Sequence, residues 1–350
     1  MSKDYQKVRD QLVSEPKIWL VTGVAGFIGS HLLEELLLLG QRVIGVDNFA
    51  TGYRHNLGHV RSSVGEEKWQ QFVLFEGSVT DFDLCLKAVK GVDCVLHQAA
   101  LGSVPRSIDN PLDSNKANID GFLTVLVAAK NSGVKSFVYA SSSSVYGDEE
   151  RLPKREEIIG KPLSPYAVTK LVNEIYAENF AQVYGFPTIG LRYFNVFGPR
   201  QDPDGAYAAV IPRWIKQLID GRQVQIFGDG KTSRDFCYIA NIVQANILAC
   251  CADNQQAKNK VYNIAVGEST SLVELYNYLS ECYSEVARKK PAQSEPAFMD
   301  FRPGDVRHSL ANIERAKELL GYQPSENVCE GLKKTFSWFY ANDPGRTTVS

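Results

Sequence analysis

The sequence lacks the segments that would carry a protein into or across a membrane. Residues 1 to 15 are polar and charged, unlike a signal peptide, and apolar runs such as Leu36 to Leu39 are far too short to span a bilayer. It also lacks an excess of either charge, and a net charge of -2 gives no reason to expect nucleic acid or an anionic membrane as a partner. We therefore expect a cytoplasmic protein with neither kind of partner.

Disulfide and metal signatures are lacking as well. The seven cysteines form an odd set without metal-ligand spacing, and the adjacent Cys250 and Cys251 are too strained to pair readily. We expect free thiols in a reducing compartment and no metal site. No internal repeat or low-complexity tract interrupts the 350 residues, which suffice for one large domain or two moderate ones.

What the sequence does contain is an alternation of short apolar runs with helical stretches. Apolar runs typical of strands buried on both faces lie at 18–21, 43–46, 72–75, 92–97, 136–140 and 187–195. Helical character follows the first run at 30–39 and recurs at 115–132. Such alternation predicts an α/β fold with a doubly wound parallel sheet, the Rossmann arrangement.

A glycine turn follows the first predicted strand. Gly23, Gly26 and Gly29 are spaced so that bare backbone can approach a pyrophosphate and helix N-terminal amides can stabilise its charge. The second strand ends at Asp47, where a carboxylate can accept both adenosine ribose hydroxyls and would repel a 2′-phosphate. A turn with a chance Asp is the alternative. Strand, glycine turn, helix and acid together favour a dinucleotide site that takes NAD rather than NADP.

Tyr166 and Lys170 stand four residues apart in a helical stretch and share one face. A cation beside a phenol favours its ionised form, lowering a pKa of about 10 and making the phenolate useful as a base. Alone, the two residues read more readily as a surface pair. The run Ser141–Ser144 follows the fifth strand, at an edge where such sheets bind ligands, although four hydroxyls also suit a self-satisfied turn. His97 is interpreted as packed rather than catalytic.

From about residue 200 the alternation weakens. Short strands are expected at 224–227 and 236–239, a strand returning to the main sheet at 261–265, helices at 241–252 and 271–288, and one closing helix rich in Lys and Glu. We predict a Rossmann domain over 1–195, joined by 235–266. A smaller C-terminal α/β substrate-binding part would comprise 196–234 and 267–350.

Several motifs in this order resemble one family. The glycine turn, the serine run before Tyr146 and Gly147, and the Tyr166/Lys170 pair resemble the extended short-chain dehydrogenase/reductase superfamily. Residues 192–199 and 234–236 are similar to its nucleotide-sugar branch. Over residues 17 to 340 the chain looks most like UDP-sugar 4-epimerases, in particular those acting on UDP-N-acetylglucosamine and UDP-N-acetylgalactosamine. The resemblance implies tightly bound NAD, a UDP-sugar substrate, a homodimer and a product that feeds surface polysaccharide synthesis.

The resemblance also implies roles for single residues. Tyr166 matches the catalytic base, Lys170 the lysine that binds the nicotinamide ribose, and Ser142 the serine that hydrogen-bonds the substrate hydroxyl, with Ser143 a fourth catalytic candidate. Ser78 departs from the family pattern, which has Asp against adenine. The implied cofactor contacts are Gly23, Gly26, Phe27, Ile28, Gly29, Asp47, Asn48, Thr51, Gly52, Ser78, Val79, Gln98, Ala99, Ala100, Tyr166, Lys170 and Tyr193. The implied substrate contacts are Gly102, Ser103, Ser142, Ser143, Ser144, Tyr166, Asn195, Ala209, Val210, Arg234, Arg302, Asp305 and Ser309.

Other functions share most of these motifs. Nucleotide-sugar 4,6-dehydratases in the family carry Asp and Glu directly after the substrate serine, whereas Ser143 and Ser144 stand here and cannot do that proton work at neutral pH. A decarboxylase is disfavoured because the run contains no Glu. A non-catalytic NAD sensor on the same fold tends to lose the Tyr/Lys pair. These differences favour epimerisation.

The choice of sugar depends on pocket size. The position matching Ser309 is bulky in relatives limited to UDP-glucose and UDP-galactose, and small in those that admit a 2-N-acetyl group. Ala209, Gly102 and Ser103 fall on other pocket-wall positions and are small as well. We therefore expect room for N-acetylhexosamines, although Ser309 also suits an ordinary loop.

Overall fold

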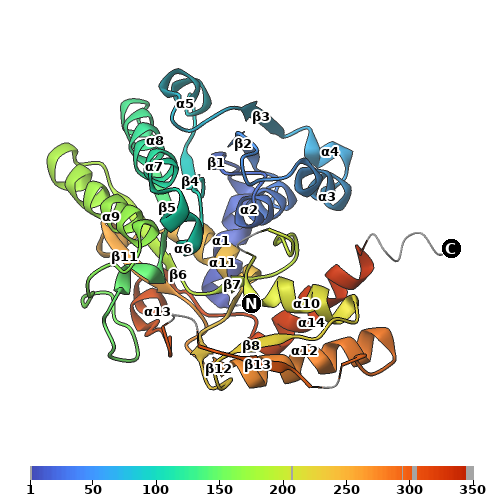
Figure 1. Cartoon of the computed structure of the whole chain (residues 1–350). Helices are drawn as coiled ribbons and strands as arrows, with labels where there is room; N and C mark the ends of the chain where they lie inside the picture. The colour runs from blue at the N-terminus through green and yellow to red at the C-terminus, as the bar shows by residue number, and fades with distance from the viewer. Residues whose placement is uncertain (1, 206–207, 294, 302–305, 344–350) are drawn as a thin grey trace.

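The computed structural model describes residues 2–205, 208–293, 295–301 and 306–343. Its centre is a seven-stranded parallel sheet in the order β11-β6-β5-β4-β1-β2-β3 (Figure 1). Because the chain turns from β3 back to the other side of β1, the exits of β1 and β4 form the crevice where such sheets bind ligands. The predicted doubly wound sheet is confirmed. Its strands are β1 (Ile18–Thr22), β2 (Arg42–Asp47), β3 (Phe72–Glu76), β4 (Cys94–His97), β5 (Ser136–Ser142), β6 (Thr188–Tyr193) and β11 (Lys260–Ile264).

Helices cover both faces of this sheet. Neighbouring strand residues alternate between two apolar layers: Val95 and Phe137 pack on one side, and Leu96 and Val138 on the other. Strands buried on both faces explain the continuous apolar runs. The first layer contains α5 (Phe82–Ala88), α8 (Gly121–Asn131) and α9 (Pro165–Tyr184). The second contains α1 (Lys3–Ser14), α2 (Phe27–Leu38), α3 (Arg54–Val64) and α11 (Ile239–Cys250).

The start and end of α9 are set by its own sequence. The Ser164 hydroxyl accepts the amide of Ala167 at 3.2 Å, and Pro165 occupies the first helical position. Gly185 ends the helix in the left-handed conformation, at φ 63°. Tyr166 therefore lies in the first turn of α9, with Lys170 one turn further along.

The C-terminal part lies at one end of the sheet, at the bottom of Figure 1. Its helices α10, α12 and α14 pack against one another. They are α10 (Val210–Ile219), α12 (Leu272–Ala287) and α14 (Val328–Ala341). Short two-stranded pairs accompany them: β7 (Val196–Phe197) with β10 (Cys237–Tyr238), β9 (Ser233–Arg234) with β12 (Thr270–Ser271), and β8 (Gln225–Phe227) with β13 (Ala297–Met299).

Two expectations about helices are wrong in detail. The stretch 115–132 is not one regular helix, because α7 (Pro111–Asn115) passes through a π-helical turn (Lys116–Asp120) before α8 begins. The closing segment forms two helices, α13 (Glu314–Leu320) and α14, because Gly321 at φ 66° stops the first. The remaining helices are α4 (Glu66–Trp69) and α6 (Val104–Asp109).

The seven cysteines are free thiols, as expected. Within the described part of the chain, no helix combines the length and the apolar character that crossing a membrane requires.

Candidate active site

The glycine turn joins β1 to α2 at the crevice. A Cβ on Gly29 would lie 2.1 Å from the Gly23 carbonyl oxygen, and Gly23 itself has a φ of 67°, so both positions require glycine. Gly26 N-caps α2 without a side-chain hydrogen bond, which leaves the first helical amides without a side-chain acceptor. Bare amides at a helix N-terminus suit a pyrophosphate.

Asp47 ends β2 beside this turn. Its two carboxylate oxygens accept the amides of Ala25 and Phe49, each at 2.8 Å. Burial raises the pKa of Asp47, and these hydrogen bonds lower it. The carboxylate lines the cleft at the position predicted for the ribose acceptor.

A cleft of about 550 Å³ runs along the strand exits and contains most of the predicted cofactor residues. Ser78 turns its hydroxyl to Thr80 Oγ1, 2.8 Å away. Gly102 and Ala209, two of the predicted sugar-pocket residues, line the same cleft. The cofactor residues that line it are Gly23, Gly26, Phe27, Ile28, Gly29, Asp47, Asn48, Thr51, Gly52, Ser78, Val79, Gln98, Ala99 and Ala100.

Ser142, Tyr166 and Lys170 meet at the exit of β5. Ser142 is the last residue of that strand, and its hydroxyl interacts with the Tyr166 phenol and lowers the pKa of that phenol. The Lys170 ammonium lies 5.9 Å from the centre of the Tyr166 ring and donates to the carbonyl of Ala140 at 2.8 Å. A base, a hydroxyl and a cation are thus assembled at one strand end.

The expected lowering of the Tyr166 pKa is not found. Burial raises the pKa of Tyr166, and only the Ser142 hydroxyl lowers it. Burial also lowers the pKa of Lys170 to about 8, against an upward effect of Glu174. The Lys170 ammonium donates to the Ala140 carbonyl rather than to the phenol. Sharing a helix face with Lys170 therefore does not lower the pKa of Tyr166.

Two residues at neighbouring strand ends pack around this group. Tyr193 ends β6, and its hydroxyl donates to Gln98 Oε1 at 3.1 Å. Gln98 lines the cleft, so this bond connects Tyr193 to the cleft wall. His97 Nδ1 lies 3.0 Å from Thr22 Oγ1, and burial lowers the pKa of His97 to about 3. His97 is therefore the packed residue expected from the sequence.

The predicted substrate residues after β6 are connected through residues 233–235. The Ser309 amide donates to the Ser233 carbonyl at 3.1 Å, and Arg234 Nη1 donates to the same oxygen at 2.9 Å. Asn195, at a φ of 33°, donates from Nδ2 to the Asp235 carbonyl at 3.1 Å. Segments far apart in sequence thus converge on one short stretch.

The serines occupy turns. Ser142 Oγ accepts the amide of Ser144 at 3.1 Å, and Ser143 begins the following 3-10 turn. Ser103 caps α6, and Val210 begins α10. Arg302 and Asp305 lie outside the described residues.

Tyr53, Arg106 and Asp202 are among the cleft residues that were not predicted from the sequence. The Tyr53 hydroxyl donates to Asp202 Oδ2 at 2.6 Å, joining two segments that line the cleft. Arg106 carries the one positive charge among the described residues lining it. Tyr53 directly follows the predicted Gly52 and could have been found as the continuation of that loop. No motif in the sequence singles out the other two.

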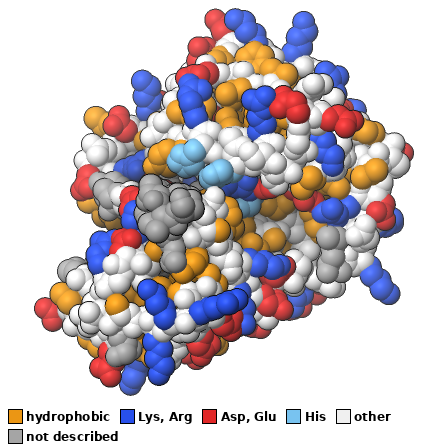
Figure 2. All heavy atoms as spheres, turned by 90° about the vertical axis from the view of Figure 1, so that its right-hand side faces the viewer, with side chains coloured by type: hydrophobic (Ala, Val, Ile, Leu, Met, Phe, Trp, Pro, Cys, Tyr) orange, Lys and Arg blue, Asp and Glu red, His pale blue; other side chains and the backbone are white. Residues whose placement is uncertain are grey.

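A second cavity, of about 600 Å³, adjoins the cleft and contains none of the predicted site residues. The rings of Tyr53, His55, His59 and Trp338 follow one another along it, with centroids 4.9, 5.9 and 5.4 Å apart. Figure 2 shows histidine side chains gathered beside a hollow, on a face where charges of both signs are mixed.

The model of the NAD dependent epimerase/dehydratase family matches residues 19–265. The chain belongs to this family. The UDP-glucose 4-epimerase of Mycolicibacterium smegmatis is 35% identical over 322 residues, 91% of this chain and 97% of that one. The UDP-glucuronate 4-epimerase of Thermodesulfobacterium geofontis is 34% identical, with 93% and 96% covered. A solved structure of a UDP-N-acetylglucosamine 4-epimerase from Methanobrevibacter ruminantium M1, in complex with UDP-N-acetylmuramic acid, is 37% identical with a TM-score of 0.83, covering 93% of this chain and 99% of that one.

Membership confirms the family predicted from the sequence and establishes NAD as its cofactor. The local structure fits a dinucleotide, because Gly23, Gly26 and Gly29 line the cleft without side chains and Asp47 lines it beside them. The similar proteins differ in the sugar that their names specify, so family membership alone does not select a substrate.

Proposed function

We propose that this protein is a UDP-sugar 4-epimerase that interconverts UDP-N-acetylglucosamine and UDP-N-acetylgalactosamine, with UDP-glucose and UDP-galactose as further candidates. The observation that carries the proposal is the interaction of the Ser142 hydroxyl with the Tyr166 phenol, whose pKa it lowers, at the start of a turn that continues with Ser143 and Ser144. A phenol and a hydroxyl can together bind and deprotonate a sugar hydroxyl. The turn offers no carboxyl group for eliminating water.

The residues act in the following order. Ser142 hydrogen-bonds the sugar 4-hydroxyl and Tyr166 takes its proton, while Lys170 stays largely protonated at neutral pH and keeps a positive charge near the phenol. NAD, when bound, supplies the hydride acceptor and donor at C4. Tyr166 then returns the proton to the oxygen of the opposite epimer. The cofactor would be held by the glycine turn, Asp47 and the other cleft residues.

The decisive experiment follows UDP-N-acetylglucosamine, UDP-N-acetylgalactosamine, UDP-glucose and UDP-galactose by NMR with no added reductant. We expect interconversion of the acetylated pair without loss of water. A 4-keto-6-deoxy product would instead identify a dehydratase. Bound NAD without any turnover would identify a sensor.

Small side chains support the choice of acetylated sugars. Ser309, Ala209, Gly102 and Ser103 would leave room beside the sugar ring. We predict that Ser309→Tyr abolishes turnover of UDP-N-acetylgalactosamine and spares UDP-galactose, because the ring fills the acetamide space. Ser309→Ala is the matched control and should keep both activities. Equal loss of both substrates in Ser309→Tyr would contradict the proposal.

We also propose a homodimer. Val168 and Ile175 lie seven residues apart on α9 and are 46% and 56% exposed. Leu112, on the adjacent α7, is 84% exposed. A helical face that is apolar and exposed in one chain suits a second copy of the same chain.

A further inference from the structure

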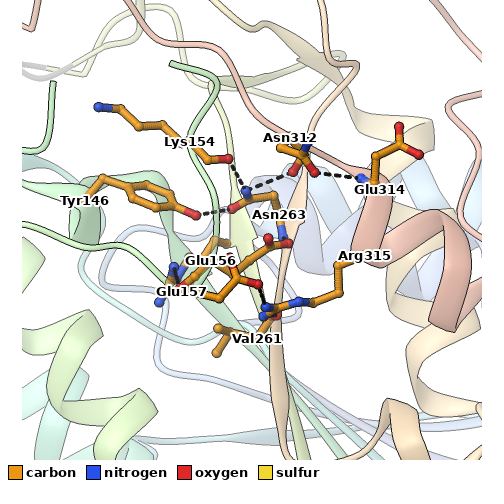
Figure 3. Close-up of polar contacts among 10 residues, drawn as sticks. Tyr146, Lys154, Glu156, Glu157, Val261, Asn263, Asn312, Glu314 and Arg315 are labelled. Atoms are coloured by element: carbon orange, nitrogen blue, oxygen red, sulfur yellow. Dashed lines mark hydrogen bonds and ion pairs between the residues drawn. The ribbon is translucent and has the colours of Figure 1, made fainter. Parts of the chain in front are cut away.

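Asn263 lies at the centre of a buried polar network that joins it to Tyr146, Lys154 and Asn312 (Figure 3). We propose that Asn263 is a positioning residue for substrate selection, which fixes the segment carrying Ser309 against the turn carrying Ser142. The inference rests on the proposed function and deepens it, because it names a residue outside the sugar pocket that sets the pocket's width.

The first connection runs from Asn263 to the catalytic turn. Asn263 belongs to β11, and its side chain is fully buried. Its Oδ1 accepts the hydroxyl of Tyr146 at 2.6 Å. Tyr146 ends the 3-10 turn that begins directly after Ser142, and this residue is 2% exposed. This buried hydrogen bond therefore holds the far end of the serine turn.

The second connection runs from Asn263 to the segment after Ser309. Its Nδ2 donates to the carbonyls of Lys154 and Asn312, at 2.9 and 3.0 Å. The two segments also bind each other through their backbones. The Lys154 N–H donates to the Leu310 carbonyl at 2.7 Å, and the Asn312 N–H donates to the Lys154 carbonyl at 2.9 Å. Figure 3 shows the Tyr146 hydroxyl and the backbone carbonyls of Lys154 and Asn312 facing the Asn263 side-chain amide, while the Lys154 side chain points away from it.

The chemistry of the position requires a side-chain amide. One hydroxyl donor and two carbonyl acceptors face the side chain, and only a group with one acceptor and two donors satisfies all three. The backbone of Asn263 is fixed as well, since its backbone N–H donates to Glu156 Oε1 at 2.9 Å. Aspartate would keep the bond to Tyr146 and would turn a carboxylate oxygen toward two carbonyl oxygens.

The Ser309 segment has further attachments that do not reach the serine turn, the first being the bond from the Ser309 amide to the Ser233 carbonyl. Asp235 Oδ2 accepts the amide of Ala311 at 3.2 Å, and the same carboxylate binds the amides of Val266 and Gly267. Loss of the Asn263 bonds should therefore loosen the segment without releasing it. If the Ser309 segment is loosened, binding should weaken only for a sugar whose 2-substituent contacts that segment.

The test compares Asn263→Asp with the wild type on both substrate pairs. We expect kcat/KM for UDP-N-acetylgalactosamine to fall about tenfold, mainly through KM, because displacements of a fraction of an ångström already cost this much. The kcat/KM for UDP-galactose should stay within about twofold of the wild-type value. If the wild type does not turn over UDP-galactose, the inhibition constant of UDP-galactose is compared between the two proteins instead. Tyr146→Phe keeps both Nδ2 bonds, so it should lower kcat for both sugars and leave their ratio unchanged.

Asn241→Asp is the matched control. Asn241 is equally buried, and its Oδ1 accepts the amides of Ser325 and Glu326, at 2.8 and 3.2 Å, while its Nδ2 donates to the Glu326 carbonyl at 2.8 Å. It lies on α11 and binds neither sugar-site segment, so its variant should lower the Tm and leave the substrate ratio intact.

Equal loss of both substrates in Asn263→Asp, or the same change of ratio in Asn241→Asp, would overturn the inference. If Asn263→Asp is insoluble, Asn263→Ser is measured in the same way. A wild type that converts neither acetylated sugar would instead refute the proposed function, a different outcome from failure of the Asn263 test.

Discussion

Burial, more than neighbouring charge, governs the titration of single residues in this site. It raises the pKa of Tyr166, lowers that of Lys170 to about 8 and lowers that of His97 to about 3. Each shift favours the neutral form, as expected where charges leave water. Positive charge that arrives with the cofactor would favour the Tyr166 phenolate during turnover.

Tyr166→Phe tests the proposed base. We expect turnover to fall at least about 10³-fold, because the phenyl ring cannot accept a proton, while NAD remains bound in the purified protein. Tyr184→Phe, an exposed change on the same helix, should leave turnover unchanged. Activity is followed by NMR, and NAD is released by denaturation and quantified. Substantial turnover by Tyr166→Phe would remove this residue from the mechanism.

His97→Gln tests the effect of burial on stability. The folded-state pKa of about 3 lies below the ordinary value of 6.5, so the unfolded chain binds the extra proton between these values and stability falls as pH falls through that window. Relative to His97→Gln, the wild type should lose about 2 kcal/mol of unfolding free energy between pH 7 and pH 5. Urea denaturation at both pH values measures the difference. Parallel losses in the two proteins would show that His97 does not titrate in this way.

At the scale of elements, close backbone contact decides where the chain can hold a dinucleotide. The β1–α2 turn is tight because Gly29 packs against the carbonyl of Gly23. The π-helical turn before α8 contributes a second contact at this scale. Within it, Asn118 Oδ1 accepts the amide of Leu101 at 2.7 Å, and Asn118 Nδ2 donates to Thr169 Oγ1 at 3.0 Å. It thereby ties the cleft wall to α9.

We predict that Gly29→Ala prevents tight binding of NAD. Its methyl group would meet the Gly23 carbonyl at 2.1 Å and force the turn open, so the purified protein should contain little NAD. Gly58→Ala is the control, because a methyl group on this exposed helical glycine of α3 would meet only open space and should stabilise the protein by about 0.5–1 kcal/mol. Normal NAD content in Gly29→Ala would contradict the proposed role of the turn.

At the scale of the whole molecule, the exposed apolar face of α9 predicts assembly. Ile175→Glu should convert a dimer into a monomer, because a buried, unpaired carboxylate at the interface is strongly unfavourable. Light scattering after size-exclusion chromatography gives the mass directly. Val13→Glu, at a similarly exposed position on α1, should leave the mass unchanged. A wild type that is monomeric at micromolar concentration would refute the dimer.

The sequence alone predicted the strands of the central sheet, the glycine turn, NAD as the cofactor and the place of Tyr166 and Lys170 on one helix. These features depend on local patterns: apolar periodicity, glycine spacing and helical repeat all act within a few residues. The break at residues 116–120 escaped prediction because these five residues include no glycine or proline to mark it. So did the end of α13, which depends on one glycine.

Only the tertiary structure decided how distant segments combine. Tyr53 meets Asp202 across 149 positions, and Asn263 joins residues 146, 154 and 312. No local pattern reports such contacts, because they arise when strand order brings separate segments together. The same holds for the Tyr166 pKa: its sequence neighbour Lys170 predicted a lower value, whereas burial by the folded chain raises it. The sequence thus determined which groups are available for chemistry, and packing determined their environment, because desolvation depends on every segment that surrounds a group.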